Sequence, residues 1–175
     1  MRVLDTERLT LRHLASSDDA FILELLNDPD WVRYIGDRGV RNLEDARAYI
    51  QKGPMAMYRR YGLGLYLVVQ KVSGAPIGMC GLLKRDALPD ADIGFAFLPG
   101  YRGRGYALEA ARAVIDDAVG RLGLARILAL VSPGNESSER LLGKLGMRFE
   151  KMIRLPGQDH DVQLFSTDAV PAESA

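Results

Sequence analysis

The chain has 175 residues, a length that suits one globular domain. Its 23 basic and 23 acidic residues cancel, so bulk charge gives no attraction to nucleic acid or to an anionic membrane. Cys80 is the single cysteine, which excludes an intrachain disulfide, and the charged residues near the N-terminus disfavour a signal peptide. We therefore expect a cytoplasmic protein that binds neither nucleic acid nor membrane.

The first half of the chain is expected to begin with a strand, continue through helices and end in a β-hairpin. Apolar residues alternate in the strands and recur at helical spacing in the helices, with Ser, Asn, Gly and Pro at the boundaries. In order, the expected elements are a strand over Glu7–Leu14, a helix capped by Ser16 or Ser17 that ends before Pro29, a turn and partly helical stretch over 28–35, a helix capped by Asn42 and interrupted by Gly53-Pro54, and strands over Leu63–Lys71 and Pro76–Lys84.

The second half predicts a crossover followed by a last hairpin. The expected elements are a strand over Asp92–Leu98, a long helix over about Arg104–Leu122, a strand over Ala125–Val131, a helix over Glu136–Leu145, and strands over Met147–Arg154 and Asp161–Thr167. A strand, a helix and a strand in succession form a right-handed crossover, so the strands on either side of the long helix should be parallel and adjacent. The order predicts an α+β fold in one domain over residues 1–168, with a frayed tail over 169–175.

A glycine-rich turn links the strand Asp92–Leu98 to the long helix. Gly103 and Gly105 allow close backbone approach to a ligand, and the start of the helix directs unpaired N–H groups at it. This arrangement suits a phosphate group. No Gly-Lys-Ser/Thr follows, which excludes a Walker A loop, and Leu108 occupies the third glycine position of the dinucleotide-binding fingerprint.

The turn resembles a motif of the GNAT superfamily of N-acetyltransferases. Arg102-x-x-Gly105-x-Ala107 is similar to the pyrophosphate-binding motif of that family. The order of the predicted elements also matches the family over nearly the whole chain. The resemblance implies a mixed, mostly antiparallel sheet whose central parallel strands splay apart, with helices on both faces.

A second segment supports the same resemblance. Asn135-x-x-Ser138, followed by Lys144-Leu145-Gly146-Met147, is similar to the family's Asn-x-x-Ala/Ser and Lys-x-Gly-Phe segment, with Met in place of Phe. The opening stretch 6–12 and the step Asn27-Asp28-Pro29 resemble the branch that contains the ribosomal-protein N-terminal alanine and serine acetyltransferases.

The resemblance implies an enzyme that uses acetyl-CoA as co-substrate, needs no metal, and moves the acetyl group directly to a primary amine. Pantetheine would lie between the splayed strands and pair with strand backbone, and an N–H near Phe97 would polarise the thioester carbonyl. Arg102 and Arg104 are expected to add mobile positive charge. The residues assigned to acetyl-CoA are Phe97, Leu98, Arg102, Gly103, Arg104, Gly105, Tyr106, Ala107 and Asn135.

Asp92 and Ser138 are the candidate catalytic residues. Asp92 stands where relatives often carry an acidic residue and would act as general base, unless it is a solvated carboxylate at a strand end. Many family members place a Tyr on the last helix to protonate the departing thiolate, but here that position is Leu142. The usual acid is then missing, or Ser138 takes its role, or CoA leaves unprotonated. Ser138 is an alternative thiol partner or a helix-start residue that bonds its own backbone. Asn135 similarly either contacts the cofactor or caps the helix.

The acceptor pocket is expected beside the N-terminal helices, with Trp31 and Tyr34 as candidate substrate-binding residues. Further aromatic and acidic residues nearby suit an amine-bearing acceptor; they are Tyr58, Tyr61, Asp28, Asp30 and Asp37. A ribosomal-protein N-terminus, another peptide amine, an amino acid, a polyamine and an aminoglycoside all remain open. The alternative function is a non-catalytic CoA-binding regulatory module of the same fold, which Leu142 favours. We expect a monomer or a homodimer.

Overall fold

The computed structural model describes residues 1–167, and every strand in that part of the chain belongs to one eight-stranded sheet. The spatial order is β1-β2-β3-β4-β5-β6-β8-β7, and all neighbouring strands are antiparallel except β5 and β6. This confirms the predicted α+β class with one parallel pair. The tail predicted over 169–175 lies outside the described residues.

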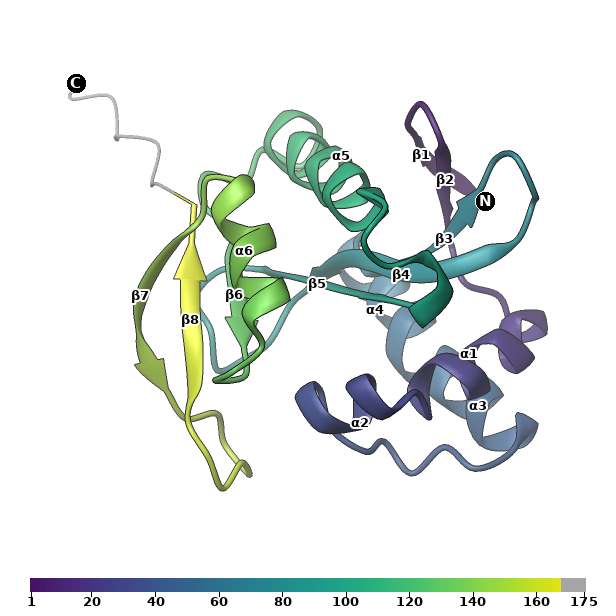
Figure 1. Cartoon of the computed structure of the whole chain (residues 1–175), viewed down its shortest axis with the longest axis horizontal. Helices are drawn as coiled ribbons and strands as arrows, with labels where there is room; N and C mark the ends of the chain where they lie inside the picture. Colours follow the sequence, from purple (N-terminus) through teal and green to yellow (C-terminus); the bar gives the residue numbers. More distant parts are fainter. Residues whose placement is uncertain (168–175) are drawn as a thin grey trace.

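The helices and strands follow the expected order, with one strand added at the start (Figure 1). Their bounds are β1 Arg2–Asp5, β2 Leu9–Arg12, α1 Asp19–Leu26, α2 Pro29–Tyr34, α3 Leu43–Ile50, α4 Ala56–Tyr61, β3 Leu65–Gln70, β4 Pro76–Leu83, β5 Asp92–Phe97, α5 Tyr106–Gly120, β6 Leu128–Val131, α6 Glu136–Lys144, β7 Arg148–Ile153 and β8 Val162–Ser166.

One expectation for the N-terminal helices is wrong and two are confirmed. Neither Ser16 nor Ser17 caps α1; a short 3₁₀ turn precedes the helix, and the carboxylate of Asp18 instead accepts the N–H of Ala15 at 2.8 Å. Gly53-Pro54 interrupts the α-helix as predicted, because α3 ends at Ile50 and the α-helix resumes only as α4, over Ala56–Tyr61. The chain widens there into a π-helical turn over Gln51–Met55, which accommodates the missing proline donor and joins α3 to α4. Asn42 caps α3 as predicted.

Helices cover both faces of the sheet, which keeps the central strands buried. In Figure 1, α5 lies above strands β4 and β5, whereas α1, α2 and α3 lie below them. One apolar cluster fills the space under α5 and α6, and a second fills the space between the sheet and α1 to α3. Because both faces are covered, β4 is a nearly continuous buried run rather than an alternating one. No helix within residues 1–167 is long and apolar enough to cross a membrane.

The parallel strands β5 and β6 separate soon after they meet. They pair only at Asp92 with Leu128 and at Ile93 with Ala129. Beyond those positions β5 continues with β4 alone, and β6 continues with β8 alone. The predicted splay therefore exists, and it leaves one edge of β5 without a neighbouring strand in the middle of the sheet.

Candidate functional site

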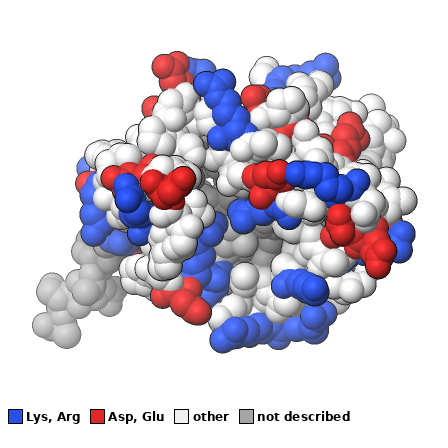
Figure 2. All heavy atoms as spheres, turned by 90° about the horizontal axis from the view of Figure 1, so that it is seen from below, with Lys and Arg blue, Asp and Glu red and all other residues white. Residues whose placement is uncertain are grey.

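A cleft of about 910 Å³ occupies the gap between β5 and β6 and extends under α2. Its walls come from both strands, from the turn before α5, from α6 and from the N-terminal helices. The volume is in the range of ligand pockets in proteins. Figure 2 shows the molecule from below, with the surface hollowed near its centre and Lys and Arg side chains at the border of the hollow.

The glycine-rich turn presents a row of N–H groups to this cleft. The first helical bond of α5 runs from the N–H of Glu109 to the carbonyl of Gly105, at 3.1 Å. Within residues 1–167, the N–H groups from Gly103 to Leu108 donate to no protein atom. Gly103 and Gly105 have φ of +73° and +82°, a region that other residues rarely adopt. The turn and the positive end of the α5 dipole thus have the geometry of an anion site.

Arg102 is not the mobile charge that the sequence predicted. Its guanidinium donates to Asp30 of α2 and to Asp28, the residue before α2, at 2.6 Å each, and to the carbonyl of Phe97 at 2.9 Å. The side chain is therefore committed to protein partners. It fixes the turn before α5 against the start of α2, so these two walls of the cleft share one ion-pair cluster.

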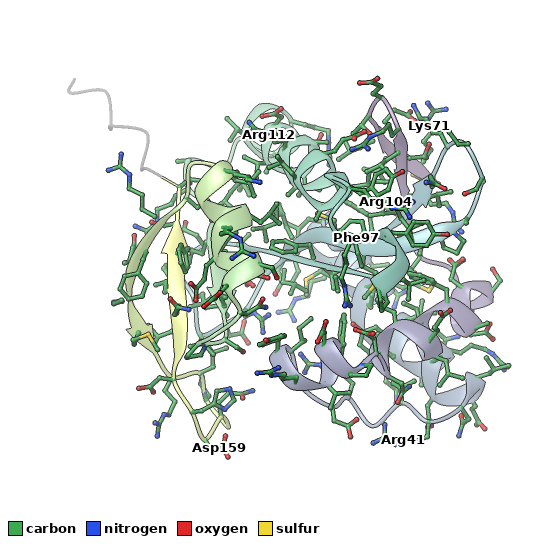
Figure 3. The ribbon with its side chains drawn as sticks, in the orientation of Figure 1. Arg41, Lys71, Phe97, Arg104, Arg112 and Asp159 are labelled. Carbon is green, nitrogen blue, oxygen red and sulfur yellow. The ribbon has the colours of Figure 1, made fainter. Side chains whose placement is uncertain are left out.

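Arg8 holds the same turn from the opposite side, a role that the sequence did not indicate. Its side chain donates to the carbonyl of Arg104 at 3.0 Å and to Glu109 at 2.6 Å, and its guanidinium carbon lies 4.3 Å from the Tyr106 ring centroid. These partners lie about a hundred positions away in sequence, so no local pattern reveals them. In Figure 3, Arg104 lies at the start of α5, near Phe97 at the end of β5.

The free edge of β5 involves Phe97 but not Leu98. The N–H of Leu98 donates to Ile77 of the β4 segment at 2.9 Å, and its carbonyl accepts from Tyr101 at 3.0 Å. Both backbone groups of Leu98 thus have protein partners, so the splay does not leave them unpaired as the sequence predicted. Alternate residues of a strand direct their backbone groups to opposite sides, so Phe95 and Phe97 face the gap. The carbonyl of Phe97 is taken by Arg102, which leaves its N–H.

Asp92 lies in the wall of the cleft, on the sheet face that α1 to α3 cover. It is 2% exposed, so it is not a solvated strand-end carboxylate. Its Oδ1 accepts from Nε of Arg85 at 2.9 Å. Burial raises the pKa of Asp92, and the charge and hydrogen bond of Arg85 oppose that rise. The group is thus a buried carboxylate that holds a proton to higher pH than a free Asp, as suits a general base.

The segment before α6 combines a capping residue with a free hydroxyl. Oδ1 of Asn135 accepts from the N–H of Ser138 at 3.4 Å and from the hydroxyl of Ser137 at 3.2 Å, which confirms the capping role. Ser138 lines the cleft, and its own hydroxyl bonds to no protein atom within residues 1–167. Leu142 is fully buried and also lines the cleft, so no acid group stands at that position.

Of the aromatic candidates for the acceptor side, Trp31 and Tyr34 line the cleft and the other two do not. Tyr58 instead donates to the carbonyl of Leu65, accepts from the N–H of Leu14, and stacks on His13. The nearby carboxylates are also not free for an amine. Asp28 and Asp30 bind Arg102, and Asp37 binds Arg41.

Comparisons with known proteins agree with this geometry. Residues 8–148 match the family model described as acetyltransferase (GNAT) domain. The chain belongs to the GNAT acetyltransferase family. It is 31% identical to the uncharacterized N-acetyltransferase YnaD of Bacillus subtilis, over 86% of this chain and 85% of the relative. An acetyltransferase structure from Agrobacterium tumefaciens is 28% identical, with a TM-score of 0.78 over 93% of this chain and 92% of that chain. A structure of RimL, a ribosomal α-N-protein acetyltransferase, in complex with coenzyme A has a TM-score of 0.80 over 95% of this chain and 97% of that chain, at 17% identity.

This GNAT acetyltransferase is an acyltransferase, as the sequence motifs predicted. The family match covers the turn before α5 and the segment Asn135 to Lys144, so both motifs lie inside it. Within residues 1–167, no group of three or more His, Cys, Asp or Glu side chains is placed to hold a metal ion.

Proposed function

We propose that this GNAT acetyltransferase binds acetyl-CoA in the cleft and transfers the acetyl group directly to a primary amine. The observation that carries the proposal is the row of N–H groups from Gly103 to Leu108, which lack protein acceptors and border the splay of β5 and β6. A pyrophosphate fits this row because it supplies many acceptor oxygens and negative charge at the end of a helix. The pantetheine arm would then lie along the free edge of β5.

Acetyl-CoA supplies an activated thioester carbonyl. Groups of the protein donate a hydrogen bond to that carbonyl and accept a proton from the amine. The N–H of Phe97 faces the gap and is a suitable donor to the carbonyl oxygen. The carboxylate of Asp92 takes the proton that the ammonium must lose before its nitrogen attacks. The new C–N bond forms as the C–S bond breaks. The nitrogen loses its second proton to the departing thiolate, which leaves as the CoA thiol, and the hydroxyl of Ser138 stabilises that sulfur by a hydrogen bond.

Ligand binding is tested by thermal unfolding with and without acetyl-CoA. At about 100 times the dissociation constant, acetyl-CoA should stabilise the folded chain by roughly 2.7 kcal/mol. Gly105→Ala should remove most of this gain, because a side chain strains φ of +82° and its Cβ would lie 3.3 Å from Arg8. Gly74→Ala is the matched control, since Gly74 has φ of +71° but lies in the β3–β4 turn. Stabilisation by ATP but not by acetyl-CoA would contradict the proposal.

Turnover is tested by release of free CoA thiol with a panel of amines, and by the mass of the acetylated product. The panel includes peptide N-termini, because RimL is by name an α-N-protein acetyltransferase. Acetyl-CoA binding without thiol release for any amine would favour the non-catalytic CoA-binding module instead. The observation that favours this non-catalytic module is that a buried leucine, Leu142, stands where an acid group would be needed.

A further inference from the structure

Several hydrogen-bond donors that line the cleft have no protein acceptor. Within residues 1–167 these are the outer nitrogens of Arg85, the indole nitrogen of Trp31 and the guanidinium of Arg38, all of which line the cleft. The carboxylates of α2 are already neutralised by Arg102. Nε1 of Trp31 is buried, so it is costly when unmet, and the two accessible guanidinium groups add positive charge. A molecule that binds beside these groups should therefore bring acceptor atoms and negative charge.

Arg85 is placed to bind a carboxylate. Only its Nε is used, in the bond to Asp92 at 2.9 Å, so its Nη1 and Nη2 groups keep their hydrogens for another partner. The Arg85 side chain is 35% exposed while the Asp92 side chain is 2% exposed. The pair therefore has its carboxylate inside and part of its guanidinium accessible. A planar guanidinium binds a carboxylate with two parallel hydrogen bonds.

Trp31 offers a second, independent sign of a ligand in the cleft. The residue is 5% exposed, and its Nε1 is buried without a hydrogen-bond partner within residues 1–167. An indole N–H is a donor only, so an acceptor atom from outside the protein would satisfy it. Trp31 belongs to the same apolar cluster as Leu25 and Leu65, with Tyr49 packed against it, and these residues also line the cleft.

We propose that the acceptor is an α-amino carboxylate, such as a free amino acid with an apolar side chain, whose carboxylate binds Arg85 while its amine faces Asp92. The inference rests on the proposed function, in which Asp92 receives the amine proton. Asp92 and Arg85 are adjacent groups of opposite charge, and an α-amino acid carries a matching pair of charges one carbon apart. A peptide N-terminus has a neutral carbonyl at that place and would gain less from Arg85.

The test compares free amino acids with their C-terminal amides at saturating acetyl-CoA, using leucine, methionine and phenylalanine. For the wild-type enzyme, kcat/KM should be on the order of 10- to 100-fold higher for each acid than for its amide, as hydrogen bonds to a charged group imply. Arg85→Gln should bring the acid-to-amide ratio close to one, and Arg85→Lys should restore part of it. The ratio is the readout because a general loss of activity affects both substrates equally.

Arg60→Gln is the matched control, because it removes an exposed charge of α4 outside the cleft and should leave the ratio unchanged. Binding is followed separately by fluorescence, since Trp31 is the only tryptophan. Titration with free leucine should change the fluorescence of Trp31 saturably in the wild-type enzyme but not in Arg85→Gln. Any of three results would overturn the inference. The amides react as well as the acids, or the acid-to-amide ratio is unchanged in Arg85→Gln, or no free amino acid is turned over or gives a saturable fluorescence response. Acetylation of peptides or polyamines alone would overturn it and leave the proposed function intact.

Discussion

The ion pair between Asp28 and Arg102 gives the sharpest stability prediction. Oδ2 of Asp28 lies 2.6 Å from Nη2 of Arg102, and the two side chains are 7% and 36% exposed. A hydrogen bond between charged groups contributes about 1.5–3 kcal/mol, and the partial exposure of Arg102 screens some of it. Asp28→Asn should therefore lower the free energy of unfolding by about 1–2 kcal/mol.

Asp30→Asn is the internal control for this prediction. Its bond to Arg102 has the same length of 2.6 Å, but its side chain is 54% exposed, so the loss should be about 0–1 kcal/mol. Urea unfolding of both variants, with equal m-values, measures the two losses. Because Arg102 begins the turn before α5, Asp28→Asn should also weaken acetyl-CoA binding more than Asp30→Asn does. Equal losses for the two variants, or no loss for Asp28→Asn, would refute the reasoning that burial decides the strength of this cluster.

Three further predictions concern the catalytic and acceptor residues. Asp92→Asn should lower kcat on the order of 100-fold, and the loss should shrink at high pH, where the amine is already neutral. Because burial raises the pKa of Asp92, the wild-type rate should fall on the acid side at a pH above the ordinary carboxyl range, and a pH–rate profile of Asp92→Asn should lack that limb. Ser138→Ala should slow thiol release while leaving the calorimetric affinity for acetyl-CoA unchanged. Trp31→Phe should raise the acceptor KM with little change in melting temperature, whereas Trp31→Ala should cost about 3–5 kcal/mol of stability.

The sequence revealed the parts of the site that depend on local pattern. Gly103 and Gly105 stand directly before a long helical repeat, and the positive φ that the structure gives them is the conformation for which glycine is favoured. The continuous apolar run that ends in β6 predicted a strand buried on both faces. Asn135 was predicted as a helix cap because asparagine is favoured at the N-cap and Asn135 directly precedes α6.

The parts that were missed depend on contacts between distant segments. The partners of Arg102 lie 72 and 74 residues earlier, so no short pattern shows that its charge is neutralised. Strand β1 is four residues long and carries charged residues at both ends, and its pairing with β2 decides its conformation.

The positions of two other residues, Arg85 and Leu98, could have been predicted from the sequence. In the hairpin of β4 and β5, Leu83 pairs with Asp92, which places Arg85 just past the strand end beside that carboxylate. Counting alternate residues from the same register shows that Leu98 directs its N–H toward β4.

The central claim is that the N–H groups from Gly103 to Leu108 bind the pyrophosphate of acetyl-CoA. Amide NMR during a titration with acetyl-CoA tests it most directly, because each N–H reports its own hydrogen bond. We predict that the amide signals of Gly103, Gly105 and Ala107 shift saturably, and that the signal of Leu98, whose N–H is bonded to Ile77, shifts much less. Saturable binding that leaves the amides of residues 103–108 unchanged would contradict the account.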